Sequence, residues 1–259
     1  MKIPKIIHYC WFGPNQIPEV ELKCIKSWSH FLPDYKLMFW NENSFDIHLN
    51  NFAKQAYEAG HYAFVSDYVR TKVLYEYGGL YLDTDEEVFE GFKELISKES
   101  NCFTAFQTRK KLGAGVMGFT PKHSVIKEFV DYYHLNNFKD INGNINTIAN
   151  VTMFTDILVK RGLKLNGSQQ MISDINVFSR EYFYPKKISD TEFITTEKTV
   201  AIHYGSCSWM TEKEKKRGLN KFWINVMRPT LRTSKNLGTK IIGERSIQKI
   251  EIKIRNLLK

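Results

Sequence analysis

The stretch SDYVRTKVLYEYGGLYLDTD, residues 66–85, combines the features that predict the fold and the site. Its first part, as far as Tyr77, belongs to a helical pattern over residues 52–77, and Gly78-Gly79 ends that helix because glycine readily takes the left-handed conformation of a helix terminus. Residues 80–82 (LYL) form a short apolar strand that stops at Asp83-Thr84-Asp85. The stretch therefore predicts a helix, a sharp turn and a buried strand that carries two acids to the end of a sheet.

Asp83 and Asp85 are the most informative pair of residues in the chain. Residues i and i+2 of a strand point to the same side, and at a strand end that side can face a ligand crevice. Two such carboxylates repel each other unless a cation lies beside them, and Mg²⁺ or Mn²⁺ prefers oxygen ligands. Because a pyrophosphate leaving group needs its charge neutralised, the pair suits nucleotide-sugar chemistry. A D-x-D pair by itself also occurs in solvated turns.

Asp67 and Arg70 lie one helical turn apart, upstream of the paired acids. Taken alone, they are an intrahelical ion pair worth about 0.2–0.5 kcal/mol. The short distance along the chain to the glycine stop, the strand and the acids instead favours a shared site.

The remaining pattern predicts a single α/β domain with parallel strand pairs. A strand at residues 3–9, a helix at 19–31 and a strand at 35–40 follow one another with connections of crossover length. Further helices are expected at residues 124–133 and 147–160, and a late strand at 199–204.

The net charge of +9 is concentrated in the last 49 residues. Residues 211–259 hold 14 Lys and Arg against 4 Asp and Glu, so the first 210 residues are nearly neutral. The tail ends in GERSIQKIEIKIRNLLK, which has the spacing of a basic amphipathic helix, although residues 250–254 also alternate like a strand. We expect a catalytic domain at residues 1–210 and a basic helical extension at 211–259, which suits an anionic membrane surface.

The four cysteines are scattered and form no C-x-x-C pair. A disulfide framework or a structural zinc site is therefore not expected, and a reducing cytoplasm fits best. The sequence also shows no apolar run of membrane-spanning length and no signal-peptide pattern.

These motifs resemble glycosyltransferase family 32, the sugar-binding D-x-D group, which includes bacterial capsule and oligosaccharide transferases. The group is more distantly similar to the clostridial glucosylating toxins. The resemblance rests on IPKIIHYCWFG at residues 3–13, SDYVR at 66–70, YGGLYLDTD at 77–85, and AIH at 201–203 followed by Ser208-Trp209. It implies a GT-A fold, with a Rossmann-like mixed sheet flanked by helices, and transfer of a sugar with retention of its anomeric configuration.

The resemblance also implies roles for individual residues. Asp67 and Arg70 would hold the donor sugar and its phosphate. Asp83 and Asp85 would be the catalytic pair that holds Mn²⁺ or Mg²⁺, with His203 as a further metal or diphosphate contact. The remaining substrate contacts would be Tyr9 and Trp11 near the base, beside Cys10, and Ser208 and Trp209 at the diphosphate.

Several of these residues have an ordinary structural alternative. His203 follows an apolar strand and suits a satisfied structural histidine. Trp11 and Trp209 suit a hydrophobic core equally well. Glu86 and Glu87 are expected to support the site or face solvent rather than act in catalysis. The glycine-rich segment 112–118 lacks a phosphate-loop ending, and we interpret it as close-packed backbone near the donor sugar.

The expected function is transfer of a hexose from a nucleotide sugar, with UDP as the favoured nucleotide, to a saccharide acceptor, in a front-face reaction without a protein nucleophile. Galactose or glucose is favoured over mannose or an N-acetylhexosamine. A bacterial capsule or surface polysaccharide on a lipid carrier, at the cytoplasmic membrane face, is the favoured setting. The alternatives are a toxin-like protein glycosyltransferase, a basic membrane- or nucleic-acid-binding module, and a phosphatase of the haloacid dehalogenase type. The phosphatase is disfavoured because Glu87 stands where that motif has Thr or Val. No nucleic-acid partner is expected.

Overall fold

The computed structural model describes residues 2–92, 95, 102–141, 143, 145, 146, 148–187, 192–206 and 230. The chain divides into two units, Met1–Ser206 and Cys207–Lys259. The predicted basic extension lies outside the described residues apart from Thr230, so its predicted helix and the domain boundary stay predictions. In the part of the chain that is described, no helix has both the length and the apolar character needed to cross a bilayer.

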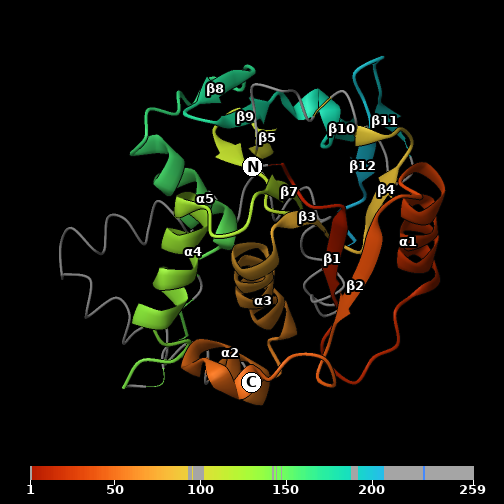
Figure 1. Cartoon of the computed structure of the whole chain (residues 1–259). Coiled ribbons are helices and arrows are strands. Elements are labelled where there is room, and N and C mark those ends of the chain that lie inside the picture. The colour runs from red at the N-terminus through yellow and green to blue at the C-terminus, as the bar shows by residue number, and fades with distance from the viewer. Residues whose placement is uncertain are drawn as a thin grey trace. The chain divides into compact units, whose positions relative to one another are not determined.

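A mixed β-sheet forms the centre of the first unit (Figure 1). Its strand order is β2-β1-β3-β7-β5-β9-β8, and β6 pairs with β5 outside this path. The β1–β2, β1–β3 and β5–β9 pairs are parallel, whereas β3–β7, β7–β5 and β9–β8 are antiparallel. The strands are β1 (Ile6–Cys10), β2 (Lys36–Trp40), β3 (Gly79–Leu82), β5 (Cys102–Thr108), β6 (Lys111–Leu112), β7 (Val116–Phe119), β8 (Gln170–Ile172) and β9 (Ile175–Phe178).

Helices pack on the sheet through two separate hydrophobic clusters. The larger cluster contains residues of α2 (Asn51–Glu58), α3 (Tyr62–Tyr77), α4 (Ser124–Leu135) and α5 (Asn150–Val159). The smaller cluster contains Trp28 of α1 (Glu19–Phe31). Helix α1 lies apart from the other four helices, beside β2 and β4 (Figure 1). Single 3₁₀ turns lie at Ile47–Leu49 and Arg180–Tyr182. The α/β prediction with a mixed sheet flanked by helices is confirmed.

The helix predicted at residues 52–77 is two helices, and the prediction of one continuous helix is wrong. The break lies at Gly60, whose φ is 74°. The amide of His61 donates to the carbonyl of Ala56 at 2.9 Å, and that of Gly60 donates to Tyr57 at 2.9 Å. These two bonds form a Schellman motif, which satisfies the last carbonyls of α2 and redirects the chain into α3.

The Gly78-Gly79 turn between α3 and β3 has positive φ values of 63° and 105°, which glycine adopts readily, but the ψ of −167° at Gly78 is extended rather than left-handed helical. A Cβ on Gly78 would stand 2.6 Å from Cδ of Pro121, and one on Gly79 would stand 2.7 Å from the carbonyl oxygen of Ile6. Glycine is therefore required twice, for the backbone conformation and for the close approach of neighbouring segments.

A second, smaller sheet joins distant parts of the chain. Strand β4 (Glu86–Val88) pairs antiparallel with β12 (Ala201–His203), as Figure 1 shows, and the register places His203 opposite Glu86. Helix α1 fixes β4 from the side, since Nε1 of Trp28 donates to the carbonyl of Glu86 at 2.7 Å. Strands β10 (Lys186–Lys187) and β11 (Phe193–Ile194) form another antiparallel pair.

His8 is a buried, neutral residue in the centre of β1. Its Nδ1 accepts a hydrogen bond from Nε1 of Trp40 at 3.1 Å, so its Nε2–H donates to the carbonyl of Gly78 at 2.8 Å. Burial lowers the pKa of His8 to about 4, although the bond to Gly78 acts in the opposite direction.

We expect His8 to make the folded state sensitive to acid. The unfolded chain binds a proton at the ordinary pKa of about 6.5, whereas the folded chain does not until pH reaches about 4. The contribution to stability is thus complete above pH 6.5 and is lost as pH falls from 6.5 toward 4. Between about pH 7.5 and pH 4.5, the free energy of unfolding of the wild type should fall by about 2–3 kcal/mol more than that of His8→Gln in urea denaturation. Equal losses in the two proteins would contradict this.

Candidate active site

Asp83 directly follows the carboxyl end of β3, which lies between β1 and β7 in the main sheet. Its backbone amide donates to the carbonyl of Gly115 at 2.8 Å, which ties it to the β6–β7 loop. Its Oδ1 accepts from the hydroxyl of Tyr81 at 3.1 Å and lies 3.0 Å from Nη2 of Arg70. One carboxylate oxygen of Asp83 is therefore neutralised by the protein, which leaves Oδ2 for a ligand.

Arg70 connects the acid of α3 with the acid of β3. Its guanidinium lies 3.3 Å from Asp67 and 3.0 Å from Asp83, donates to the carbonyl of Ala114 at 2.7 Å, and stacks 4.5 Å above the ring of Tyr81. Burial by itself lowers the pKa of Arg70, but Asp83, Tyr81 and Asp67 together raise it well above its ordinary value. Arg70 is thus a permanent buried positive charge at the centre of the site.

Asp67 is held between Arg70 and α5. Nδ2 of Asn150, the first residue of α5, donates to Oδ1 of Asp67 at 2.5 Å. Burial raises the pKa of Asp67 to about 6, while Arg70 acts in the opposite direction. The helix α5 therefore takes part in building the site, at a distance of 83 residues along the chain.

Asp85 and His203 form the second half of the site. Nδ1 of His203 lies 3.4 Å from Oδ1 of Asp85 and 3.0 Å from Oε1 of Glu86. The other oxygen of Asp85 accepts from the amide of Ser206 at 2.8 Å. The β4–β12 pairing therefore brings the late histidine to the early acids.

Glu86 and His203 are a coupled buried pair. Burial raises the pKa of Glu86, whose side chain is fully buried, although His203 acts in the opposite direction. Burial alone lowers the pKa of His203, but the charge of Glu86 beside it raises that pKa overall. Oε2 of Glu86 has no hydrogen-bond partner among the described residues, which is unusual for a buried carboxylate.

The residues present fit a divalent cation. Ligand atoms of Asp83, Asp85 and His203 all lie within 4.8 Å of one another. The two carboxylates suit Mg²⁺ or Mn²⁺, which prefer oxygen ligands and share them with substrate phosphates. His203 has the position of a third ligand. To bind the metal through Nδ1, it would have to lose the proton on that atom and break its contact with Glu86.

Gly115 gives the site its space. A Cβ on Gly115 would stand 2.8 Å from Oδ2 of Asp83 and 3.1 Å from Oε1 of Glu86. The hydroxyl of Tyr184 holds the same loop by accepting from the amide of Val116 at 3.0 Å. The glycine-rich segment is therefore close-packed backbone beside the acids, as its sequence indicates.

The predicted base-binding residues lie on or next to β1. Tyr9 stacks on Phe39 with ring centroids 5.0 Å apart and meets Trp28 edge to face. Trp11 donates from Nε1 to the carbonyl of Asn15 at 2.7 Å. Because β1 runs parallel to β3, Trp11 lies at the same end of the sheet as the acids. Tyr9 is partly buried between Trp28 of the core and the more exposed Phe39. Ser208 and Trp209 lie outside the described residues.

Sequence reasoning missed several residues that build the site. Asn150 and Tyr184 carry no motif, and only the fold brings them near. Glu86 adjoins the D-x-D pair, but its complete burial follows from the pairing with β12, which the sequence does not reveal. Glu87 is also buried and bonds to the hydroxyl of Tyr204 and to Lys23, so the alternative of a solvated Glu86-Glu87 pair is wrong.

Comparisons with known proteins agree with this geometry. Residues 18–102 match the family described as a glycosyltransferase sugar-binding region containing a DXD motif. The chain is 39% identical over 139 residues to inositol phosphoceramide mannosyltransferase 3 of Schizosaccharomyces pombe, a match that covers 49% of this chain and 36% of that protein. It is 27% identical over 202 residues to an uncharacterised glycosyltransferase of Acanthamoeba polyphaga mimivirus, covering 71% and 73% of the two chains.

The fold is also that of a known glycosyltransferase structure. The PaToxG glycosyltransferase superposes with a TM-score of 0.50 at 20% identity, over 61% of this chain and 68% of that one. The fold and the site thus define a GT-A type α/β domain. Within it, residues 18–102 match a glycosyltransferase sugar-binding region containing a DXD motif, which confirms the resemblance seen in the sequence. The chain spans only about a third of the length of the yeast mannosyltransferase.

Replacing Gly115 by alanine should disturb the acids without unfolding the protein. The added methyl displaces Oδ2 of Asp83, and a misplacement of about 1 Å at a reacting centre costs about 100-fold. We expect Gly115→Ala to weaken Mn²⁺ binding in calorimetric titration by about 10-fold or more. Gly91→Ala is the control, because its Cβ meets only the carbonyl of Phe31 at an ordinary 3.4 Å. Equal Mn²⁺ affinity in the two variants would show that Asp83 is not a ligand.

Proposed function

We propose that the protein is a metal-dependent, retaining glycosyltransferase that moves a hexose from a nucleotide sugar to a saccharide acceptor. The observation that carries the proposal is the buried cluster at the end of β3, in which Arg70 holds Asp83 and the β4–β12 pair brings His203 to Asp85. The DXD family match of residues 18–102 supports the same activity.

The arrangement suits departure of a nucleoside diphosphate. A divalent ion held by Asp83 and Asp85 would supply positive charge where negative charge develops on the leaving phosphate. Arg70 adds a second, permanent charge from the opposite side of Asp83, and it orients that acid through a contact of 3.0 Å. Asp67, which Asn150 and Arg70 hold in place, is the group that we assign to the hydroxyls of the donor sugar.

The donor is the part of the proposal that needs the broadest test. The D-x-D resemblance favours UDP with galactose or glucose, whereas the yeast relative is named as a mannosyltransferase. Galactose, glucose and mannose are all hexoses. Enzymes distinguish such donors by a few contacts to the sugar hydroxyls and to the nucleotide. The reaction is proposed to take the front-face route, in which the leaving phosphate helps to deprotonate the acceptor. A trapped glycosyl ester on an aspartate or glutamate would overturn this route.

Hydrolysis of a panel of UDP and GDP sugars tests the activity. Purified protein with Mn²⁺ should release the nucleotide from one donor, and EDTA should abolish the release. Asp85→Asn should reduce it by about 100-fold or more, since removal of one group that stabilises developing charge has effects of this size. Asp131→Asn, on the exposed face of α4, is the matched carboxylate control and should retain full activity. Absence of metal-dependent binding of any UDP or GDP sugar would refute the proposal.

We further propose that the acceptor is a lipid-linked saccharide for capsule or surface polysaccharide, used at the cytoplasmic face of a membrane. The support is the charge distribution, with 14 Lys and Arg against 4 Asp and Glu in residues 211–259. Each basic residue near an anionic surface contributes about 1 kcal/mol.

Removal of residues 240–259 should therefore reduce binding to vesicles that contain phosphatidylglycerol. Binding of the full chain should fall steeply with added salt, and binding to neutral phosphatidylcholine vesicles should stay low for both proteins. Nucleotide release from the soluble donor is the control for an intact catalytic domain. Unchanged sedimentation with anionic vesicles after the deletion would assign the tail a structural role.

A further inference from the structure

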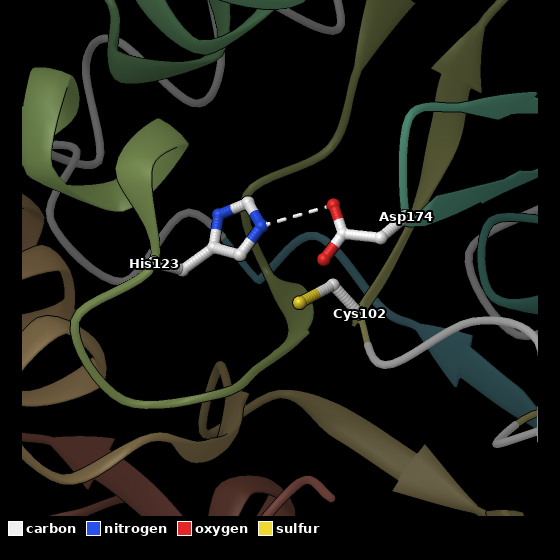
Figure 2. Close-up of side chains that lie close together, drawn as sticks. All are labelled: Cys102, His123 and Asp174. Carbon is white, nitrogen blue, oxygen red and sulfur yellow. Dashed lines mark hydrogen bonds and ion pairs between the residues drawn. The ribbon is translucent and has the colours of Figure 1, made fainter. Parts of the chain in front are cut away.

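A second cluster of metal-ligating side chains lies away from the paired acids. Cys102 comes from the first residue of β5, His123 caps α4, and Asp174 lies in the turn between β8 and β9. Their ligand atoms all lie within 4.8 Å of one another, and Nε2 of His123 is 3.2 Å from Oδ1 of Asp174. Figure 2 shows the imidazole, the carboxylate and the thiol directed toward one another.

This cluster is at the opposite end of the sheet from Asp83. In the antiparallel β3–β7 pair, the start of β3 at Gly79 faces the end of β7 at Phe119, and the end of β3 faces Val116. Phe103 of β5 pairs with Gly118, which places Cys102 at the edge where β3 begins. The cluster is therefore separate from the proposed donor site and does not depend on the proposed function.

Strained backbone precedes two of the three residues. Among the described residues, Lys122 and Ser173 are the non-glycine residues with positive φ, at 60° and 54°. Lys122 is directly followed by His123, and Ser173 by Asp174. Such conformations carry an energetic cost, persist only where the surroundings enforce them, and cluster at ligand-binding sites. Ser173 is the first residue of the two-residue turn between β8 and β9, where positive φ is usual, whereas Lys122 has no such turn to account for it.

The alternative of a nucleophilic cysteine does not fit. Cys102 is 1% exposed, and burial raises the pKa of its thiol to about 11, whereas reactive cysteines are thiolates at neutral pH and reachable from solvent. A simple His123–Asp174 pair would account for those two residues but not for the direction of the thiol, whose Sγ also lies 3.9 Å from the hydroxyl of Thr120. Asp174, whose side chain is 46% exposed, gives the cluster an opening to solvent.

We propose that Cys102, His123 and Asp174 bind Zn²⁺. Thiolate, imidazole and carboxylate are the ligands that zinc takes in proteins, with three protein ligands and a water in a tetrahedral arrangement. The 3.2 Å between Nε2 and Oδ1 is close to the roughly 3.4 Å expected for two ligands of one zinc ion. The ion would tie the β8–β9 turn to α4 and β5.

Zinc binding would change the hydrogen bonding of His123. Its Nδ1 now accepts from the amide of Val125 at 3.2 Å, as the cap of α4. An imidazole that binds zinc through Nε2 carries its proton on Nδ1, so this capping bond would be given up. The loss of one cap is small beside the free energy with which proteins bind structural zinc.

Cobalt substitution tests the site in the full-length protein. Co²⁺ bound by Cys102 should give a thiolate-to-cobalt charge-transfer absorption at one molar equivalent, and Zn²⁺ should displace it. Co²⁺ at Asp83 and Asp85 has no thiolate ligand and does not give this absorption. Cys102→Ser should abolish the band while retaining the circular dichroism of the wild type. A missing band in the wild type, or a band that survives in Cys102→Ser, would overturn the proposal.

Two further variants separate metal binding from folding. His123→Asn preserves a capping oxygen for α4 but removes the imidazole, and Asp174→Asn alters only the half-exposed turn. Each should weaken Zn²⁺ binding by at least 10–100-fold, the cost of losing even an outer-shell partner. Zn²⁺ should raise the melting temperature of the wild type and of the surface control His30→Asn by the same amount, and that of His123→Asn by less, because the site at Asp83 and Asp85 can also bind the ion in all three proteins. An equal rise in all three would contradict the assignment.

Discussion

The buried contact between Arg70 and Asp83 is the interaction on which the rest of the site depends. Arg70 joins α3 to β3 through Asp83, and reaches the β6–β7 loop through the carbonyl of Ala114. Removing one partner from such a buried pair would leave an uncompensated charge, which costs about 3–5 kcal/mol. Because the guanidinium also contacts Asp67, the same group that stabilises the fold locally determines where both acids stand.

The local part of this arrangement could be predicted from the sequence, because it lies within twenty consecutive residues. Helix periodicity, the glycine pair and the apolar strand each follow from short-range rules, and the structure has α3, a glycine turn with positive φ at Gly78-Gly79, and β3 in those places. The same rules failed at Gly60, where apolar spacing continued across a helix break. A lone glycine is compatible with a helix interior, and the Schellman bonds that end α2 depend on backbone geometry.

The parts that could not be predicted all depend on contacts between distant segments. Pairing of β4 with β12 buries Glu86 and brings it to His203, and α5 supplies Asn150 to Asp67. The scattered cysteines gave no zinc motif, although the fold places Cys102 beside a histidine and an aspartate that lie 21 and 72 positions further along the chain. Sequence spacing reports ligands that share one hairpin or helix, and it is silent when three elements each contribute one.

The β4–β12 pair also determines when during synthesis the site can be assembled. Ser206, which binds Asp85 through its amide, leaves the ribosome 121 residues after that acid. At about 5–20 residues per second, this interval is roughly 6–24 s. In chain order the last strand of the main sheet is β9, which ends at Phe178, so all strands of this sheet are translated before His203. A nascent chain can therefore bury most of its core while its acids still lack their last partners. The site is completed only near the end of synthesis of the first unit.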